Sequence, residues 1–503
     1  MSTPSFRLRD LPRLLRENSR NRLTSFGVDG KMCARPYSDV YADVMAARAG
    51  LVARGLPLNE SARAVVAGPP GYDWLVGALA CLFSGVEVIA LPETLEEADA
   101  TASLQGLPFD FAITQAKMAP FGVFAQVPRV PLEGFGAPAS GLAVVDLDES
   151  PRFSIVAFTS GSTARAKLKS FRVTAESTAA FTEAFIQSFS LRAEDNWVVC
   201  HSFSHVVHFE YVLGGLGWGY DVTLADPLRV LMNGAELRPS ALVSVPSVYE
   251  QLATVIERRG GDVTKVLGDR LKVLIIGAAP SSAELQRRLC ALGLPLYEGY
   301  GMSETNMIAC NLPACARPGT VGAVWPGISV ALDDEGVILA RAQPPRADGY
   351  LNVSAEESAA TFLAGGWVRT GDLGAFEDGS LKIIGRLKEI VVTSGGEKVN
   401  AAAIEARLRE LPEVGHALVF GERRPYVVAV FAPREGGSLP SEELLRTRLE
   451  EMNRSLPHHE RVLGFLRLPA PLDVDSGLLT RSFKPRRSVI EERYAREIAA
   501  LYA

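Results

Sequence analysis

Apolar residues along the chain recur at two spacings, which predict helices and strands that follow one another. Residues 37–55 carry Val40, Val44, Ala47 and Leu51 at helical spacing and end on glycine, so we expect an amphipathic helix there. A second helix is expected at residues 248–257. Short apolar runs bounded by turn residues predict buried strands at residues 63–67, 86–91, 110–114, 153–158, 241–245 and 271–276. Strands that alternate with helices in this way are typical of layered α/β folds.

The pattern starts afresh near residues 385–388, where the apolar run 381–384 ends and a new series of strands and helices begins. A chain of 503 residues is too long for a single hydrophobic core. We therefore predict the α/β class with two or three lobes, divided into two domains at this boundary. A large N-terminal domain of layered αβ sheets spans residues 1–387, and a small C-terminal α+β domain spans residues 388–503.

Composition and charge narrow the classes of function. Hydrophobic residues make up 47% of the chain, which is ample for a globular interior, and the net charge of −6 argues against nucleic acid as a main partner. The six cysteines lack paired C-x-x-C spacing, so we interpret them as buried apolar residues in a reducing compartment. Residues 1–10 contain no apolar signal core, and no apolar run reaches membrane-spanning length. We expect a soluble, cytoplasmic protein, and the sequence leaves its oligomeric state open.

A run of hydroxyl residues follows the predicted strand 153–158. It reads Thr159-Ser160-Gly161-Ser162-Thr163-Ala164-Arg165-Ala166-Lys167. Hydroxyls and backbone N–H groups that follow a strand suit a polyphosphate, and a lysine adds a positive charge. The segment is not a Walker phosphate loop, because it lacks the Gly-Lys-Ser/Thr ending. Taken alone, it is equally well an ordinary loop rich in serine and threonine.

This segment resembles the phosphate-binding loop of the adenylate-forming (ANL) superfamily, which includes acyl-CoA synthetases, luciferases and peptide-synthetase adenylation domains. Members usually carry Thr-Ser-Gly-Ser-Thr-Gly-x-Pro-Lys, whereas here Ala164 replaces the second glycine and Ala166 replaces the proline. Four later segments resemble further motifs of the superfamily, in its order and at its usual spacing. They are Tyr300-Gly301-Met302-Ser303-Glu304, Arg369-Thr370-Gly371-Asp372-Leu373, Gly385-Arg386-Leu387-Lys388-Glu389 with Ser394-Gly395-Gly396-Glu397, and Thr480-Arg481-Ser482-Phe483-Lys484.

The resemblance implies that the chain binds ATP or an acyl adenylate, together with Mg²⁺. It assigns the α-phosphate to Ser303, the metal to Glu304 and the ribose to Asp372 and Arg386. An ionised carboxylate such as Asp372 can accept hydrogen bonds from both ribose hydroxyls. Taken singly, Glu304 and Asp372 would be read as solvated turn residues. The remaining implied nucleotide contacts are Thr159, Ser160, Gly161, Ser162, Thr163 and Lys167 for the phosphates, and Gly277, Ala278, Ala279, Tyr300 and Gly301 for the adenine side.

The C-terminal motifs imply a second, thiol-dependent step. In the superfamily a lysine at the place of Lys484 bridges the carboxylate and the α-phosphate, although a lysine near a chain end is usually a solvated charge. Gly395 and Gly396 would line the tunnel for the pantetheine arm of coenzyme A, where glycine lets the backbone approach a slim ligand. The resemblance also places the hinge of a mobile C-terminal domain at Lys388.

Two clusters have competing interpretations. His201, His205 and His208 would share one face of a helix and could bind zinc, but no H-E-x-x-H arrangement accompanies them. In acyl-CoA synthetases a histidine at this place separates the acyl pocket from the nucleotide, and we interpret His205 as its counterpart. The glycine-rich segment 214–219 is a weak match to a dinucleotide loop, and we interpret it as a tight packing turn.

The predicted function is therefore an acyl-CoA ligase that forms a thioester from a carboxylic acid through an acyl adenylate. The apolar stretch 205–220 and the lack of a pocket aspartate favour an apolar acid, either fatty, aryl or polycyclic. The two replacements in the phosphate loop suggest a restricted form of this function, in which the protein uses only a preformed acyl adenylate and coenzyme A. The alternative is a non-catalytic protein that binds nucleotide or acyl groups, and an oxygen-dependent luciferase is a remote option.

Overall fold

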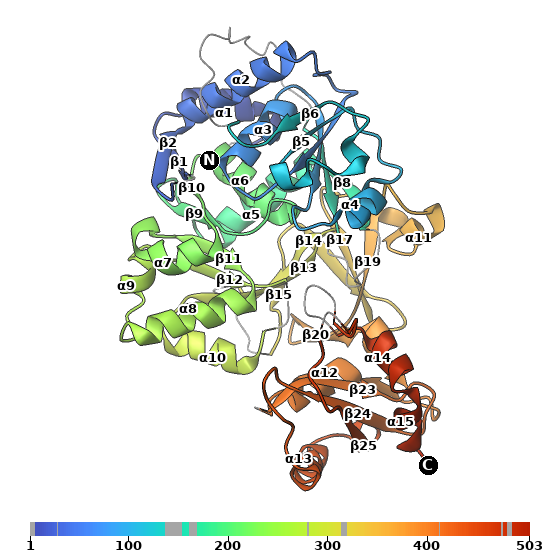
Figure 1. Cartoon of the computed structure of the whole chain (residues 1–503). Coiled ribbons are helices and arrows are strands. Elements are labelled where there is room, and N and C mark those ends of the chain that lie inside the picture. The colour runs from blue at the N-terminus through green and yellow to red at the C-terminus, as the bar shows by residue number, and fades with distance from the viewer. Residues whose placement is uncertain are drawn as a thin grey trace.

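The structure of the protein is a computed structural model that describes residues 6–27, 29–135, 153–159, 168–278, 281–312, 319–411, 413–473, 476–479 and 485–503. It has a large N-terminal domain and a smaller C-terminal domain, which lies at the bottom of Figure 1. The predicted α/β class and its division into a large and a small domain are confirmed. Among the described residues, no helix is both long enough and apolar enough to cross a membrane.

Helices of the N-terminal domain alternate with its strands. They are η1 (Leu8–Asp10), α1 (Leu11–Glu17), α2 (Tyr37–Ala53), α3 (Tyr72–Leu82), α4 (Glu97–Leu104), η2 (Ala116–Met118), η3 (Gly122–Phe124), α5 (Ala175–Ser188), α6 (Val206–Trp218), α7 (Pro227–Leu237), α8 (Pro246–Arg258), α9 (Thr264–Leu267), α10 (Ala283–Ala291), α11 (Ala355–Ala359) and η4 (Ala364–Gly366).

The strands of this domain form three sheets. The nine-stranded sheet has the order β15 (Ala323–Val324), β14 (Asn306–Cys310), β13 (Leu296–Met302), β12 (Val273–Ile276), β11 (Ala241–Ser244), β9 (Asn196–Val199), β10 (Asp221–Leu224), β1 (Arg22–Phe26) and β2 (Met32–Pro36). The six-stranded sheet has the order β6 (Arg129–Pro131), β5 (Phe111–Thr114), β3 (Arg63–Ala67), β4 (Glu87–Leu91), β7 (Ile155–Phe158) and β8 (Ser170–Val173). The five-stranded sheet contains β16 (Ile328–Leu332), β17 (Val337–Ala342), β19 (Trp367–Glu377), β18 (Phe362–Leu363) and β20 (Ser380–Arg386).

Helices cover both faces of the two larger sheets, which explains why central strands such as β5 and β12 are buried along their whole length. On β12, Ile275 faces the main core, where α3 packs on β3 and β4 and α6 packs on β9 and β10. Its neighbours Leu274 and Ile276 face a second core that includes Tyr249 and Leu252 of α8. Helices α7, α8 and α10 lie together on that side of the sheet in Figure 1. A strand that is buried on both faces carries apolar residues at successive positions, whereas a strand with one exposed face alternates apolar and polar residues.

The C-terminal domain is built on a three-stranded sheet. Its elements are η5 (Leu387–Glu389), β21 (Ile390–Val392), β22 (Lys398–Asn400), α12 (Ala401–Leu408), β23 (Val414–Phe420), β24 (Val427–Pro433), α13 (Glu442–Arg454), η6 (His458–Glu460), β25 (Val462–Arg467), α14 (Arg487–Arg493) and α15 (Ala495–Ala500). Strands β23, β24 and β25 form the sheet, and β21 pairs with β22 in a separate hairpin. Two cores lie on the opposite faces of the sheet, one with α12 and α13 and the other with α14 and α15.

The elements predicted from apolar spacing agree closely with the structure. The expected helix 37–55 is α2, which ends at Ala53, and Gly55 follows with a φ of 70°. The run 63–67 is β3 at both ends, and the expected helix 248–257 lies within α8. The remaining predicted strands correspond to β4, β5, β7, β11 and β12, with ends that differ by no more than two residues.

Candidate active site

The structure brings together three residues from three separate motifs. The hydroxyl of Tyr300 on β13 donates a hydrogen bond of 2.8 Å to Asp372 Oδ2, and Arg386 Nε lies 2.9 Å from Asp372 Oδ1. Asp372 of β19 and Arg386 of β20 are directly opposed in the antiparallel pair, so the register of these strands sets the contact. Asp372 is buried, and burial together with its negative charge raises the pKa of Tyr300. The result is a carboxylate held between a phenol and a guanidinium.

Gly277 and Ala278 continue this site beside Tyr300. They follow β12, whose Ile276 pairs with Glu298 at the start of the segment that leads to Tyr300. A Cβ at Gly277 would lie 2.9 Å from the carbonyl oxygen of Gly299, so the chain needs glycine there. Ala278 has a φ of 62°, which is uncommon for a residue with a side chain. Ala279 lies outside the described residues.

Ser303 and Glu304 occupy the turn between β13 and β14. Gly301 enters this turn so closely that a Cβ there would lie 2.1 Å from the carbonyl oxygen of Asn306. Glu304 is buried and accepts a hydrogen bond from the hydroxyl of Tyr350. Burial raises the pKa of Glu304, and the bond from Tyr350 opposes the rise.

The base of the predicted phosphate loop adjoins the same turn. Strands β7 and β8 pair antiparallel, and Thr159 N donates a bond of 2.8 Å to Lys169 O, which holds the two ends of the loop together. Strand β8 is linked in turn to the Tyr350 segment, because Phe171 and Tyr350 form a bridge. Lys169 Nζ lies 4.8 Å from the centre of the Tyr350 ring. The predicted contacts Ser160, Gly161, Ser162, Thr163 and Lys167 lie outside the described residues.

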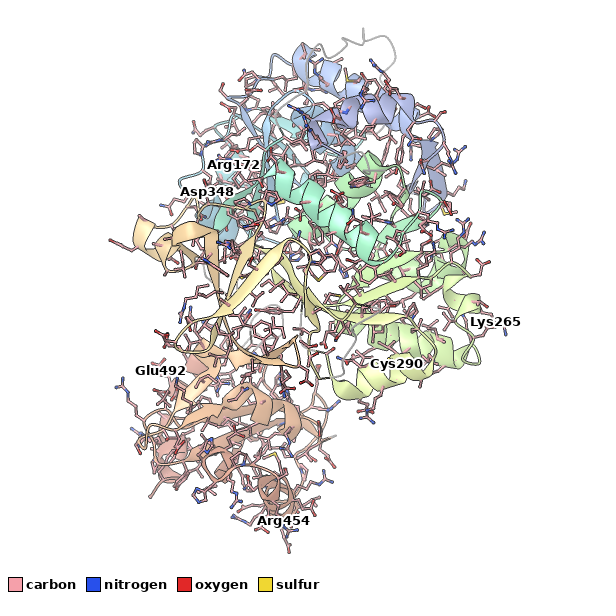
Figure 2. All side chains as sticks on the ribbon, turned by 180° about the vertical axis from the view of Figure 1, so that it is seen from behind. Arg172, Lys265, Cys290, Asp348, Arg454 and Glu492 are labelled. Atoms are coloured by element: carbon pink, nitrogen blue, oxygen red, sulfur yellow. The ribbon has the colours of Figure 1, made fainter. Side chains whose placement is uncertain are left out.

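Charged side chains lie on the outer side of this junction. Arg172 of β8 donates hydrogen bonds to Glu87 of β4. Asp348, two residues before Tyr350, adds a negative charge nearby, and Figure 2 shows Arg172 and Asp348 at the same edge of the large domain. The pKa of Arg172 is raised first by its hydrogen bond to Glu87 and to a smaller extent by the charge of Asp348.

The residues around Glu304 fit a magnesium ion that is shared with phosphates. Mg²⁺ usually takes one or two protein carboxylates and completes its shell with water and substrate phosphate oxygens. Glu304 offers one buried carboxylate of this kind, with Ser303 beside it and the phosphate-loop hairpin joined to it through Tyr350. No group of three or more His, Cys, Asp or Glu side chains that could hold a metal occurs among the described residues. Bound there, the ion would neutralise phosphate charge.

Family models match almost the whole chain. Residues 28–361 match the model described as AMP-binding enzyme, which covers more than half of the chain, and residues 388–503 match the AMP-binding enzyme C-terminal domain. The chain belongs to the AMP-binding enzyme family. The resemblance to the adenylate-forming superfamily is thereby confirmed.

Individual relatives within the family are CoA ligases by name. The chain is 34% identical to the long-chain-fatty-acid–CoA ligase FadD15 of Mycobacterium bovis over 259 residues, which are 47% of this chain and 43% of that protein. It is 27% identical to 2-succinylbenzoate–CoA ligase of Bacillus mycoides over 51% of this chain and 55% of that one. The chain thus spans about half the length of the curated relatives it matches. A structure of O-succinylbenzoate coenzyme A synthetase (MenE) from Bacillus subtilis, solved with ATP and magnesium ion, shares the fold, with a TM-score of 0.79, 17% identity and coverage of 95% and 98% of the two chains.

The histidine cluster does not have the expected geometry. Of the three, His208 alone lies within α6, while His205 is the residue before its first turn and His201 lies in the preceding segment, so they share no helix face. The rings of His201 and His208 are nevertheless 4.9 Å apart, and His201 Nε2 and Ser244 Oγ are hydrogen-bonded at 2.7 Å. Burial lowers the pKa of His201 to about 4 and holds that of His208 well below its usual value. Both rings are therefore neutral at pH 7. His205 lies at the surface, and its partial burial lowers its pKa as well.

The glycine-rich segment is not the predicted turn. Gly214, Gly215 and Gly217 lie within α6, where side chains of other elements come very close. A Cβ at Gly214 would lie 2.4 Å from Thr182 Cγ2 of α5, and one at Gly217 would lie 2.0 Å from the Phe6 ring. The glycines serve close packing, as expected, but they lie on a helix and not in a turn. Glycine is needed there because the neighbouring elements leave no room for side chains.

The C-terminal domain carries the predicted thiol residues on the hairpin of β21 and β22. Gly395 and Gly396 form its exposed tip, where Gly396 has a φ of 79° and donates its N–H to Thr393 O at 3.0 Å. Ser394 N is bonded to Arg424 O at 2.8 Å, which ties the tip to the rest of the domain. Lys388 is exposed and lies in η5, between the two domains. Lys484 lies outside the described residues.

Two residues of the site were missed by sequence reasoning. Tyr350 contacts Glu304, and Arg346 donates a bond of 2.7 Å from Nε to the carbonyl oxygen of Ser303. Arg346 also pairs with Glu210, a fully buried carboxylate on α6. A glutamate in an otherwise apolar helix needs a partner when it is buried, and that signal could have pointed to Glu210. It could not have named Arg346, which is 136 residues away.

Proposed function

We propose that the protein is an acid–thiol ligase that joins a carboxylic acid to coenzyme A through an acyl adenylate. The observation that carries the proposal is the meeting of Tyr300, Asp372 and Arg386, because it forms one acceptor flanked by an aromatic ring and a cation. Such a set suits an adenosine, with the ring against the base and the carboxylate toward the ribose hydroxyls. The CoA ligases among the relatives support the reaction class.

In the adenylation half, a carboxylate oxygen of the acid attacks the α-phosphorus of ATP and pyrophosphate leaves. Ser303 would bind the α-phosphate, and Glu304 would hold Mg²⁺, which supplies charge neutralisation. The hydroxyl and lysine groups of the loop after β7 would bind the outer phosphates. Tyr350 orients the Glu304 carboxylate by its hydrogen bond. Lys484 is proposed to bridge the acid and the α-phosphate.

In the thiol half, the sulfur of coenzyme A attacks the acyl carbon and AMP leaves. We propose that residues 388–503 turn about Lys388 relative to residues 1–387 and bring Gly395 and Gly396 to the site. The exposed tip of their hairpin has the bare backbone that a slim pantetheine arm requires. The thiol is assigned to coenzyme A because of the relatives, and a carrier-bound arm has the same chemistry.

The acid is proposed to be apolar. Helix α6 is buried along most of its length and presents aromatic and aliphatic side chains to its surroundings. His205 stands exposed at its start, at the place of the acyl gate. A fatty, aryl or polycyclic acid suits apolar surroundings of this kind better than an amino acid, whose ammonium group would need a carboxylate partner.

A second candidate is restricted to the thiol half-reaction and starts from a preformed acyl adenylate. Ala164 and Ala166 favour it, because they replace a glycine and a proline in the loop that would bind the outer phosphates. An acyl adenylate has neither of these phosphates, so its binding would not depend on this loop.

Parallel assays with purified protein test both candidates. One series supplies ATP, Mg²⁺, coenzyme A and a panel of apolar acids, and the other supplies the matching acyl adenylates and coenzyme A. Thioester in both series supports the full ligase, and thioester from the adenylates alone supports the restricted enzyme. Binding of AMP without thioester in either series would contradict both and leave a nucleotide-binding protein.

A further inference from the structure

A fully buried ion pair lies beside the turn that carries Ser303 and Glu304. The side chain of Glu210 is 0% exposed and that of Arg346 is 2% exposed. Arg346 donates to the carboxylate from two nitrogens, Nη1 to Oε1 at 2.5 Å and Nη2 to Oε2 at 2.9 Å. Removing two charges from water is costly, and such pairs often stabilise a fold no better than apolar side chains of the same size. Its presence therefore calls for a reason other than stability.

The carboxylate of Glu210 accepts two more hydrogen bonds. Thr178 Oγ1 of α5 donates to Oε1 at 2.8 Å, and Asn306 Nδ2 donates to Oε2 at 2.8 Å. With the two bonds from Arg346, both oxygens are fully used. Four elements meet at this one group: α5, α6, the start of β14 and the segment after β17 that contains Arg346.

Hydrogen bonds from Arg346 and Glu210 hold both ends of the turn that carries Ser303 and Glu304. Arg346 Nε donates to Ser303 O at 2.7 Å, which fixes the first residue. Asn306 follows the turn with a φ of 66°, and its side chain is held by Glu210 on one side and by Met307 N, at 3.0 Å, on the other. Glu304 lies between these two anchor points. Its backbone position is thus set by bonds that converge on a single carboxylate.

We propose that Glu210 and Arg346 are positioning residues that fix the Ser303–Glu304 turn in the geometry that binds Mg²⁺ and phosphate. Neither residue is proposed to touch substrate, and the inference rests on the proposed function. Glu210 lies on α6, the helix that follows His205. The same ion pair therefore links the helix next to the proposed acyl pocket with the turn proposed to bind phosphate. Ligands held by a rigid outer layer of hydrogen bonds lose little freedom when the substrate binds.

Substitutions separate positioning from plain stability. The double variant Glu210→Leu with Arg346→Met replaces both charges by apolar side chains, which a purely structural pair tolerates. The variant Arg346→Lys keeps a positive charge for Glu210 but lacks the planar fork that reaches Ser303 O at the same time. Arg346→Met alone leaves the Glu210 charge buried without its partner and serves as the destabilised control.

The experiment measures ATP binding by calorimetry across a range of Mg²⁺ concentrations, with adenosine binding and thermal unfolding alongside. We expect the double variant to unfold near the temperature of the parent and to bind adenosine, which lacks phosphate, equally, while both it and Arg346→Lys need about tenfold more Mg²⁺ for the same ATP affinity. Arg346→Lys keeps the test valid if the double variant does not fold. Parental Mg²⁺ dependence in a folded variant would overturn the positioning role alone. Failure of the parent to bind ATP with Mg²⁺ would overturn the adenylation function and the positioning role with it.

Discussion

The turn between β13 and β14 in the N-terminal domain and the hairpin of β21 and β22 in the C-terminal domain both contain glycine, yet they are built in opposite ways. In the first, Glu304 is buried and a Cβ at Gly301 would lie 2.1 Å from a backbone oxygen. In the second, Gly395 and Gly396 are exposed, and a Cβ at Gly395 would meet nothing nearer than 3.8 Å. Glycine serves close backbone packing in the first turn. In the second it leaves space open.

The difference follows from what each turn would bind. A phosphate group and its metal need ligands that are already in place, because reorganising charged groups during the reaction is costly. A pantetheine arm needs a clear path past the backbone. The four bonds that converge on Glu210 therefore belong to the first turn. The hairpin of β21 and β22 is held mainly by backbone bonds at its base, such as those of Thr393 N to Glu397 O and Ser394 N to Arg424 O, and its glycine tip projects beyond them.

The largest effect is expected from Gly301→Ala. The added methyl group would collide with the backbone of Asn306, which a small side-chain movement cannot relieve. We expect the free energy of unfolding to fall by about 2–3 kcal/mol, as for other overpacked sites. Denaturant unfolding followed by circular dichroism measures the change. Gly395→Ala is the matched control and should stay within about 0.5 kcal/mol of the parent. Equal losses in both variants would remove the contrast between the two turns.

Gly395→Trp is expected to act on the thiol step without affecting folding. The indole would obstruct the proposed path of the pantetheine arm and lower the rate of thioester formation from supplied acyl adenylate by roughly a hundredfold. AMP affinity and unfolding temperature should match those of the parent, because the tip contacts neither the core nor the Asp372 site. Thioester formation at the parental rate would show that the tunnel lies elsewhere.

Asp372→Ala tests the nucleotide side. The variant loses an acceptor whose hydrogen bonds are worth roughly 1.5–3 kcal/mol each, so AMP binding measured by calorimetry should weaken by about tenfold or more. Tyr300→Phe is the control, since it keeps the ring but removes the hydroxyl that donates to Asp372. It should change AMP affinity by less than about threefold, the equivalent of a weak hydrogen bond. Unchanged AMP affinity in Asp372→Ala would remove this carboxylate from the site.

The smallest effect concerns pH and is confined to the N-terminal domain. Burial keeps the pKa of His201 at about 4, below the 6.5 of a free histidine. Between these two values the unfolded chain binds a proton that the folded chain excludes, so stability is full above pH 6.5 and falls as the pH drops. At pH 5.5 the loss from His201 should be about 1 kcal/mol. His201→Gln should unfold with a shallower pH dependence between pH 7 and 5.5, and an identical dependence would place the titration elsewhere.

Much of the fold and part of the site could be predicted from the sequence, because those features are local. The apolar run 153–158 predicts strand β7, and the hydroxyl residues that follow it predict a polyphosphate-binding loop. The motifs that contain Tyr300, Asp372 and Arg386 predict that these residues share one nucleotide, and the structure brings them within hydrogen-bonding distance of one another. The roles of these residues stay predictions. The spacing of the histidines puts them on one face only if all three lie on a helix, and α6 begins at Val206, after His201 and His205.

Only the tertiary structure decided the partners that lie far apart in the sequence. The sequence by itself determined where strands, helices and turns form, since apolar spacing and turn residues act within a few positions. It did not determine that Glu210 meets Arg346, that Tyr350 meets Glu304, or that Phe6 fills the space beside Gly217. A buried charge, or a glycine within a packed helix, indicates that another residue must lie against it. Which residue supplies that partner depends on how the sheets and helices pack, because packing brings together groups that share no sequence pattern.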